Sequence, residues 1–191
     1  MRLTPNLLDP VASGLVQLRQ ELQLPGPHSP EVVAAATEAA RLFQPGDRRD
    51  LTDRPFATLD PATSTDLDQA FHLYADGSDM VLEYAIADVS AFVPRGGPVD
   101  EEAWTRGRTF YLPDGRIPLH PSAIGEGAAS LVPGEVRGAY VWRFELDAEG
   151  EVRATTLERA RVRSRRQYDY VEVQDLVDAG AAEEQLVLLR E

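Results

Sequence analysis

The sequence predicts an α+β fold: a mixed, largely antiparallel sheet with packed helices, preceded by a short helical segment. Three observations support this class. Residues 1–46 have apolar side chains at helical spacing, the middle of the chain contains two β-hairpin patterns, and the pattern becomes helical again from Tyr168. Helical and strand patterns that are segregated along a chain favour an α+β arrangement.

The chain opens with two predicted helices. Apolar residues recur at helical spacing over residues 1–24, and the Pro-Gly-Pro-rich stretch that follows ends the first helix. Ser29, followed by a proline and an acidic residue, is typical of a helix N-cap, so a second helix is expected over residues 30–42. We therefore assign residues 1–46 to a helical N-terminal segment and residues 47–191 to a second unit.

The second unit begins with strands. A short apolar run ends at Asp60, and a hairpin with an Asp-Gly turn follows it. A helix is expected from Asp100 to Arg108, and a second hairpin turns around residues 147–150. The predicted strands are Phe56–Leu59, Gln69–Tyr74, Met80–Ala87, Tyr140–Leu146 and Glu151–Arg165.

Composition restricts the class of protein. The chain of 191 residues has a net charge of −13, so its bulk charge alone disfavours nucleic acid, although every basic residue is an arginine, which can bind phosphate through two donors. It has no cysteine, which excludes disulfide-linked partners and thiolate chemistry and is compatible with a cytoplasmic protein. The sequence contains neither a long apolar segment nor a secretory signal, so no membrane association is expected.

The strongest chemical signal is a group of three aspartates. Asp66 and Asp68 are two residues apart, so an extended backbone directs both side chains to one side, and the polar loop after Asp60 can bring its carboxylate toward them. Three adjacent carboxylates repel one another unless protons or a cation neutralise them, and hard oxygen ligands suit Mg²⁺ or Mn²⁺. The alternative is a solvated acidic loop, which the spacing alone favours.

An ordered series of sequence blocks surrounds these aspartates. Together the blocks resemble the catalytic domain of the ribonuclease II (RNB) family over about residues 49–175, in the order of that family. This resemblance outweighs the solvated-loop alternative. The blocks are Arg49–Pro61, Asp66–Ala70, Ala85–Val93, Gly107–Asp114, Arg116–Pro121, Ala129–Pro133 and Arg163–Tyr170.

The resemblance implies a hydrolytic 3′→5′ exoribonuclease that acts on single-stranded RNA and releases nucleoside 5′-monophosphates. By motif position, Asp60, Asp66 and Asp68 are the expected catalytic, metal-binding residues for Mg²⁺, with Mn²⁺ as a substitute. Tyr111 is expected to stack against the terminal nucleotide, which is favourable for any base. The alternative for Tyr111 is a core aromatic beside Phe110.

Two departures from the family pattern qualify this expectation. Gln69 stands where the family usually has a fourth aspartate; its amide oxygen can ligate a metal, but the side chain is neutral and cannot act as a base. The family's catalytic domain is also longer, so residues 47–191 are interpreted as the N-terminal portion of an incomplete RNB-like domain. These departures motivate a second hypothesis, a catalytically impaired RNA-binding or interaction domain.

Arginines provide the remaining candidates. Arg106, Arg108 and Arg116 lie on either side of Tyr111 in the sequence and are expected to contact RNA phosphates. A stripe of alternating arginines from Arg159 to Arg165 could follow an RNA backbone, but an exposed strand face balanced by nearby acids is the favoured interpretation.

Overall fold

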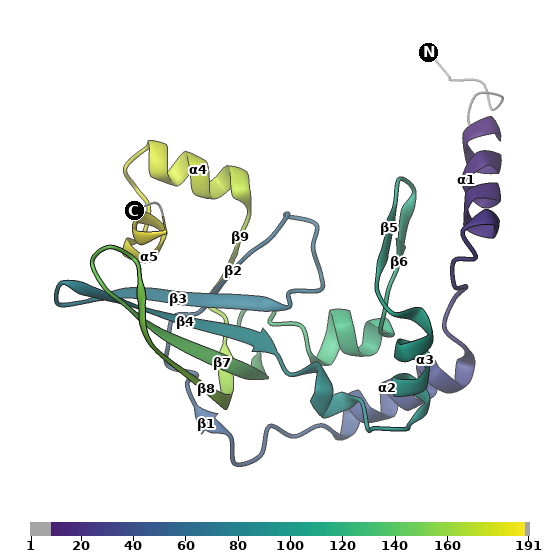
Figure 1. The fold of residues 1–191 in the computed structure, drawn as a ribbon, viewed down its shortest axis with the longest axis horizontal. Helices are drawn as coiled ribbons and strands as arrows, with labels where there is room; N and C mark the ends of the chain where they lie inside the picture. The colour runs from purple at the N-terminus through teal and green to yellow at the C-terminus, as the bar shows by residue number, and fades with distance from the viewer. Residues whose placement is uncertain (1–8, 190–191) are drawn as a thin grey trace.

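The computed structural model describes residues 9–189, which form a seven-stranded sheet, a separate two-stranded hairpin and helices around them (Figure 1). The strand order is β1-β8-β7-β4-β3-β2-β9, in which the central pairs are antiparallel and only the β1–β8 and β2–β9 edge pairs are parallel. The predicted α+β class with a largely antiparallel sheet is confirmed. The strands are β1 (Arg49–Asp50), β2 (Ala57–Leu59), β3 (Gln69–Asp76), β4 (Asp79–Ala87), β7 (Val136–Leu146), β8 (Val152–Arg163) and β9 (Arg166–Tyr168).

The helices gather at two ends of the sheet. Figure 1 shows α4 next to β9 and α5 over β3, whereas α2 and α3 lie at the opposite end, near the hairpin of β5 and β6. No helix within residues 9–189 has the length and apolar character needed to cross a membrane. The remaining elements are α1 (Asp9–Glu21), α2 (Pro30–Leu42), η2 (Val89–Phe92), α3 (Pro98–Arg106), β5 (Phe110–Leu112), β6 (Gly115–Ile117), the π-helical turn η3 (Ala123–Ala128), α4 (Tyr170–Asp178) and α5 (Glu184–Leu188).

Two apolar clusters hold these elements together. The larger one joins the sheet to α2, η2 and η3, and it includes the fully buried side chains of Phe56, Leu67 and Ile124. The smaller one places Leu186 of α5 against Phe71 of β3. Burying side chains of this size contributes about 1.5–3 kcal/mol each, so these contacts fix where the helices sit on the sheet.

Several predicted boundaries differ from the structure. The first helix is described from Asp9, and the part of that prediction on residues 1–8 lies outside the described residues. The helix predicted over residues 100–108 begins two residues earlier and ends at Arg106, because Gly107 adopts a left-handed conformation with φ of 73°. Ser29 caps α2 as predicted, since its Oγ accepts a hydrogen bond from the backbone N–H of Val32.

Two of the four arginines in the predicted stripe, both on β8, are paired with acids, which confirms the favoured interpretation for those two. Arg159 binds the fully buried carboxylate of Asp88, and Arg161 binds Asp50 on the neighbouring strand β1. These pairs tie β8 to the edge strand β1 and to Asp88, which follows β4.

Candidate active site: an acidic cavity beside the sheet

The three aspartates come from one loop whose two ends are fixed to the sheet. Asp60 directly follows β2, and its backbone N–H donates a hydrogen bond to the carbonyl of Tyr168 on β9, with an N–O distance of 3.1 Å. At the other end, the carbonyl of Asp68 accepts a hydrogen bond from the N–H of Ala87 on β4, at 2.9 Å. The loop between them brings Asp60 back toward Asp66 and Asp68.

Leu67 determines the direction of the aspartates on either side of it. Its side chain is fully buried in the larger apolar cluster. Its N–H donates to Ser130 Oγ at 3.0 Å, and its carbonyl accepts from the N–H of Leu131 at 2.8 Å. Because neighbours in an extended segment point in opposite directions, Asp66 and Asp68 face away from the core on one side.

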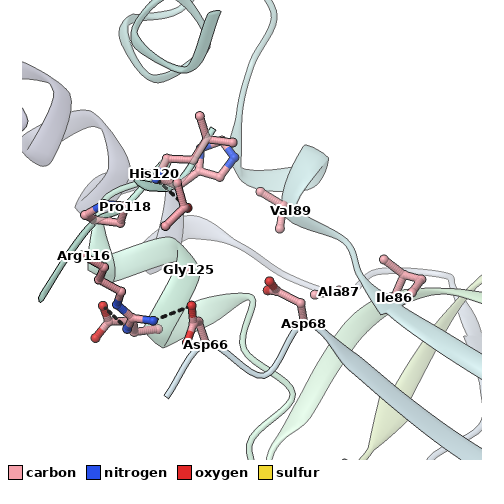
Figure 2. Close-up of a pocket in the computed structure, with 12 residues that line it drawn as sticks. Asp66, Asp68, Ile86, Ala87, Val89, Arg116, Pro118, His120 and Gly125 are labelled. Carbon is pink, nitrogen blue, oxygen red and sulfur yellow. Dashed lines mark hydrogen bonds and ion pairs between the residues drawn. The ribbon is translucent and has the colours of Figure 1, made fainter. Parts of the chain in front are cut away.

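A cavity of about 420 Å³ collects the predicted residues. Side chains of all three aspartates line it, together with Tyr111 and Arg116 from the β5–β6 hairpin. Gln69 at the start of β3 and Tyr170 at the start of α4 also line it. A neighbouring cavity of about 300 Å³ shares Asp66, Asp68 and Arg116 with the first (Figure 2).

The charge in the cavity is predominantly negative. Partial desolvation and the charge of Asp66 raise the pKa of Asp60 above its usual range. Partial desolvation also raises the pKa of Asp68, with added repulsion from Asp66 and Asp60. The carboxylates therefore lie close enough to repel one another, and additional positive charge in the cavity would stabilise their ionised forms.

Arg116 supplies the one positive charge among the residues that line these two acidic cavities. Its Nη1 lies 2.6 Å from Oδ2 of Asp66, and its Nη2 lies 2.9 Å from Oε1 of Glu126 on η3 (Figure 2). The hydrogen bond to Asp66 and the charges of both acids raise the pKa of Arg116, so the guanidinium stays charged.

Comparison with known proteins identifies the family. The model of the RNB domain matches residues 48–189, most of the chain. The chain belongs to the RNB domain family. Ribonuclease R of Mycoplasma pneumoniae is 35% identical over 136 residues, which cover 71% of this chain and 19% of that protein. The chain therefore spans about a fifth of the length of this relative.

Solved structures agree with the RNB assignment. The apo form of Mycoplasma genitalium RNase R superposes with a TM-score of 0.81 at 27% identity, covering 90% of this chain and 27% of that one. The same RNase R in complex with ribose-methylated single-stranded RNA gives a TM-score of 0.73 at 28% identity, covering 80% of this chain and 25% of that one. This RNB domain is thus homologous to ribonucleases, one of which has been solved with RNA.

The RNB domain brings together most, but not all, of the residues predicted from the sequence. Tyr111 is 74% exposed and lines the acidic cavity, so the alternative of a core aromatic does not describe it. Arg108 is not among the residues that line the cavity; its guanidinium lies over the ring of Phe110, 5.0 Å from the centroid. The expectation for Arg106 is wrong, because its side chain is buried and binds Glu102.

Gln69 is held by a neighbouring strand. Its Oε1 accepts a hydrogen bond from the hydroxyl of Tyr84 on β4. That contact occupies one of the two lone pairs with which the amide oxygen could approach a cation. Gln69 therefore lines the cavity as a neutral, already hydrogen-bonded side chain, and its proposed role as a metal ligand remains a prediction.

Two cavity residues were not predicted. Tyr170 opens α4 and is 59% exposed, and Glu126 lies on a π-helical turn, a geometry that often occurs at functional sites. Glu126 stands between two glycines in the sequence and is ten residues from Arg116, on a different element, so no local periodicity links the two. Only the folded structure, which brings Glu126 of η3 within reach of the Arg116 side chain, reveals the pair.

The donor set fits a hard divalent cation, although the carboxylates are not arranged as a ready-made cage. All three predicted ligands offer carboxylate oxygens, the type that Mg²⁺ and Mn²⁺ prefer. The pKa values of Asp60 and Asp68 are raised, and a bound cation would lower them. Within residues 9–189, no group of three or more acidic, histidine or cysteine side chains is arranged to hold a metal ion. Arg116 already occupies the carboxylate of Asp66.

Proposed function

We propose that this chain carries the metal-binding part of a hydrolytic, Mg²⁺-dependent 3′→5′ exoribonuclease that acts on single-stranded RNA. The supporting observation is the convergence of three carboxylates, an exposed tyrosine and an arginine on one cavity of an RNB domain. Family membership supports RNA as the substrate. The cation and the polarity of degradation are inferences from the chemistry of the cavity and from the family resemblance.

Each residue has a task in this proposal. The ring of Tyr111 would stack on the base of the terminal nucleotide, which binds RNA without sequence preference. Arg116 would pair with a phosphate oxygen. Water would add to the phosphorus and release the 3′ oxygen of the preceding nucleotide with a proton, so the 5′-phosphate remains on the released mononucleotide.

In this proposal, the negative charge of the cavity is the reason that the reaction needs a cation. An RNA phosphate that approaches Asp60, Asp66 and Asp68 meets like charge, and one arginine does not balance three carboxylates. The three aspartates would hold Mg²⁺, which supplies positive charge at the phosphate and favours ionisation of water. Mn²⁺ would be expected to substitute.

The test is a hydrolysis assay on the full chain with a 5′-labelled single-stranded oligoribonucleotide. We expect Mg²⁺-dependent shortening from the 3′ end with nucleoside 5′-monophosphates as products, and loss of that activity in Asp68→Asn. Asp53→Asn is the matched control, because Asp53 is exposed and does not line the cavity. Undiminished hydrolysis in Asp68→Asn would refute the assignment.

A second function is supported by Gln69. The cavity has a neutral side chain at the position of the family's usual fourth aspartate, and that side chain is tied to Tyr84. A catalytically impaired domain that binds RNA would retain Tyr111 and Arg116 but would not cleave. RNA binding without hydrolysis, in the presence of either Mg²⁺ or Mn²⁺, would favour this alternative.

A further inference from the structure

Arg116 stands between two carboxylates that belong to different parts of the fold. Asp66 comes from the loop that precedes β3, and Glu126 comes from the π-helical turn η3. The guanidinium uses a different nitrogen for each acid, at 2.6 Å and 2.9 Å, and Nη2 also donates to Thr65 Oγ1 at 3.2 Å. Figure 2 shows Asp66 next to the guanidinium of Arg116 and Asp68 farther from it, beyond Asp66.

We propose that Arg116 is a displaceable internal cation of the acidic cavity and that Glu126 is the positioning residue that retains it when a divalent cation takes Asp66. The inference rests on the proposed function, because it assumes that Asp66 is a metal ligand. It assigns a role to Glu126, which is outside the predicted ligand set.

Geometry supports an exchange of partners without a large movement. Arg116 is anchored by two contacts that do not involve Asp66, those with Glu126 and Thr65. When a cation binds Asp66, the guanidinium can therefore keep its remaining partners and stay at the cavity edge. Nη1 would then be free to pair with an RNA phosphate.

Exposure shows that the exchange is feasible at modest cost. The side chains of Arg116, Asp66 and Glu126 have relative exposures of 29%, 27% and 35%, so water reaches all three. Ion pairs of this kind contribute little net stability, and either partner can be solvated when the pair opens. A fully buried pair would resist displacement.

The ion pair between Arg116 and Asp66 would also affect the affinity of the cavity for a metal ion. A cation that binds Asp66 must compete with the guanidinium that already neutralises it. Glu126 shifts this competition, because it offers Arg116 a second acid to hold. Without Glu126, Arg116 would stay on Asp66 and oppose the metal more strongly.

The test is a double-mutant cycle on metal affinity, measured by isothermal titration calorimetry of the full chain with Mg²⁺ alone. Arg116→Met should tighten Mg²⁺ binding about fivefold, and Glu126→Gln should weaken it by a similar factor, which is the upper range for a solvent-accessible ion pair. If Glu126 acts through Arg116, adding Glu126→Gln to Arg116→Met should produce no further change. Additive effects would show that both residues act only through general electrostatics and would overturn the proposal.

The controls separate this proposal from the proposed function. Arg41→Met and Glu38→Gln make the same charge changes in an exposed ion pair on α2, and they should leave Mg²⁺ affinity unchanged. If Asp68→Asn does not weaken Mg²⁺ binding, the metal site itself fails. If Asp68→Asn weakens binding but the cycle is additive, the metal site stands and the role of Glu126 fails.

A spectroscopic measurement tests the exchange directly. The Nε–Hε signal of Arg116, assigned by its loss in Arg116→Met, should shift when Mg²⁺ is added to the wild-type chain. The shift should be absent in an Asp66→Asn background, where neither the pair nor the metal ligand is intact. A signal that does not respond to Mg²⁺ in the wild type, while calorimetry shows binding, would contradict the exchange.

Discussion

Asp88 and Arg159 form a two-donor ion pair: Nε and Nη2 of the arginine lie 3.1 and 2.9 Å from the carboxylate oxygens of Asp88. The carboxyl group is fully buried, and Nη2 of Arg48 also donates to its Oδ2 at 2.8 Å. Burial alone would raise the pKa of Asp88, but hydrogen bonds from Arg159, Arg48 and Ser90 lower it below the usual range. Asp88 therefore has a structural role, since it binds Arg159 and Arg48, and it does not line either acidic cavity.

Replacing Asp88 with asparagine should destabilise the protein by about 2–3 kcal/mol, because it leaves two arginines without their buried partner. Urea denaturation at pH 7 measures the loss. A lowered pKa stabilises the fold above the unfolded value of about 4, and this contribution disappears as the pH falls through the folded value. The difference between wild type and variant should therefore shrink below about pH 4, and a difference that grows there would contradict this role.

Asp68→Asn should stabilise the metal-free protein, whereas Asp88→Asn destabilises it. A raised pKa means that ionised Asp68 destabilises the fold, so stability is lost as the pH rises from about 4 through the folded value. In the presence of EDTA at pH 7, the melting temperature should rise by about 1–2 °C, a small change because Asp68 is exposed to solvent. A fall in melting temperature, relative to the Asp53→Asn control, would mean that the carboxylate is stabilising.

Tyr111→Ala should weaken the binding of a single-stranded oligoribonucleotide about tenfold, whereas Tyr111→Phe should retain it, because stacking needs the ring and not the hydroxyl. Fluorescence anisotropy in an Asp68→Asn background avoids cleavage during the measurement. Trp104→Ala is the control, since Trp104 is 82% exposed and is not among the cavity residues. Equal losses for Tyr111→Ala and Trp104→Ala would argue against a specific stacking position.

Ser130→Ala should affect both stability and metal affinity. The buried Ser130 hydroxyl accepts from Leu67 N–H and donates to the carbonyl of Thr65, so its loss leaves two backbone groups without partners, at a cost of about 1–3 kcal/mol. Ser164→Ala removes a buried hydroxyl with one bond and serves as the control. Calorimetry should show weaker Mg²⁺ binding for Ser130→Ala but not for Ser164→Ala. Ser130, unlike Ser164, hydrogen-bonds to the loop that bears Asp66.

Local periodicity explains what could be predicted from the sequence. Two-residue alternation places Asp66 and Asp68 on one side of a buried Leu67, and the same alternation separates exposed Tyr111 from Phe110. The antiparallel hairpins follow from their turns and apolar patterns. The ordered blocks around the aspartates indicated the family. The spacing of the three acids alone was not sufficient to indicate it.

Contacts between distant elements explain what could not be predicted. The pair of Arg116 and Glu126 joins a side chain of the β5–β6 hairpin to one of the π-helical turn η3, and no spacing in the sequence signals that contact. Arg106 resembles its neighbours in the sequence, yet α3 directs it inward, where it binds Glu102 and the carbonyl of Gly26. The short parallel edge pairings also depend on chain segments about one hundred residues apart.

The β2–β9 pairing has a consequence for how the protein is made. Asp60 donates a backbone hydrogen bond to Tyr168, so this contact can form only after β9, about one hundred residues further along the chain, has left the ribosome. Contacts of such sequence separation form late and slow folding. The Asp60 end of the acidic loop would thus lack this partner on the nascent chain until translation has passed β9.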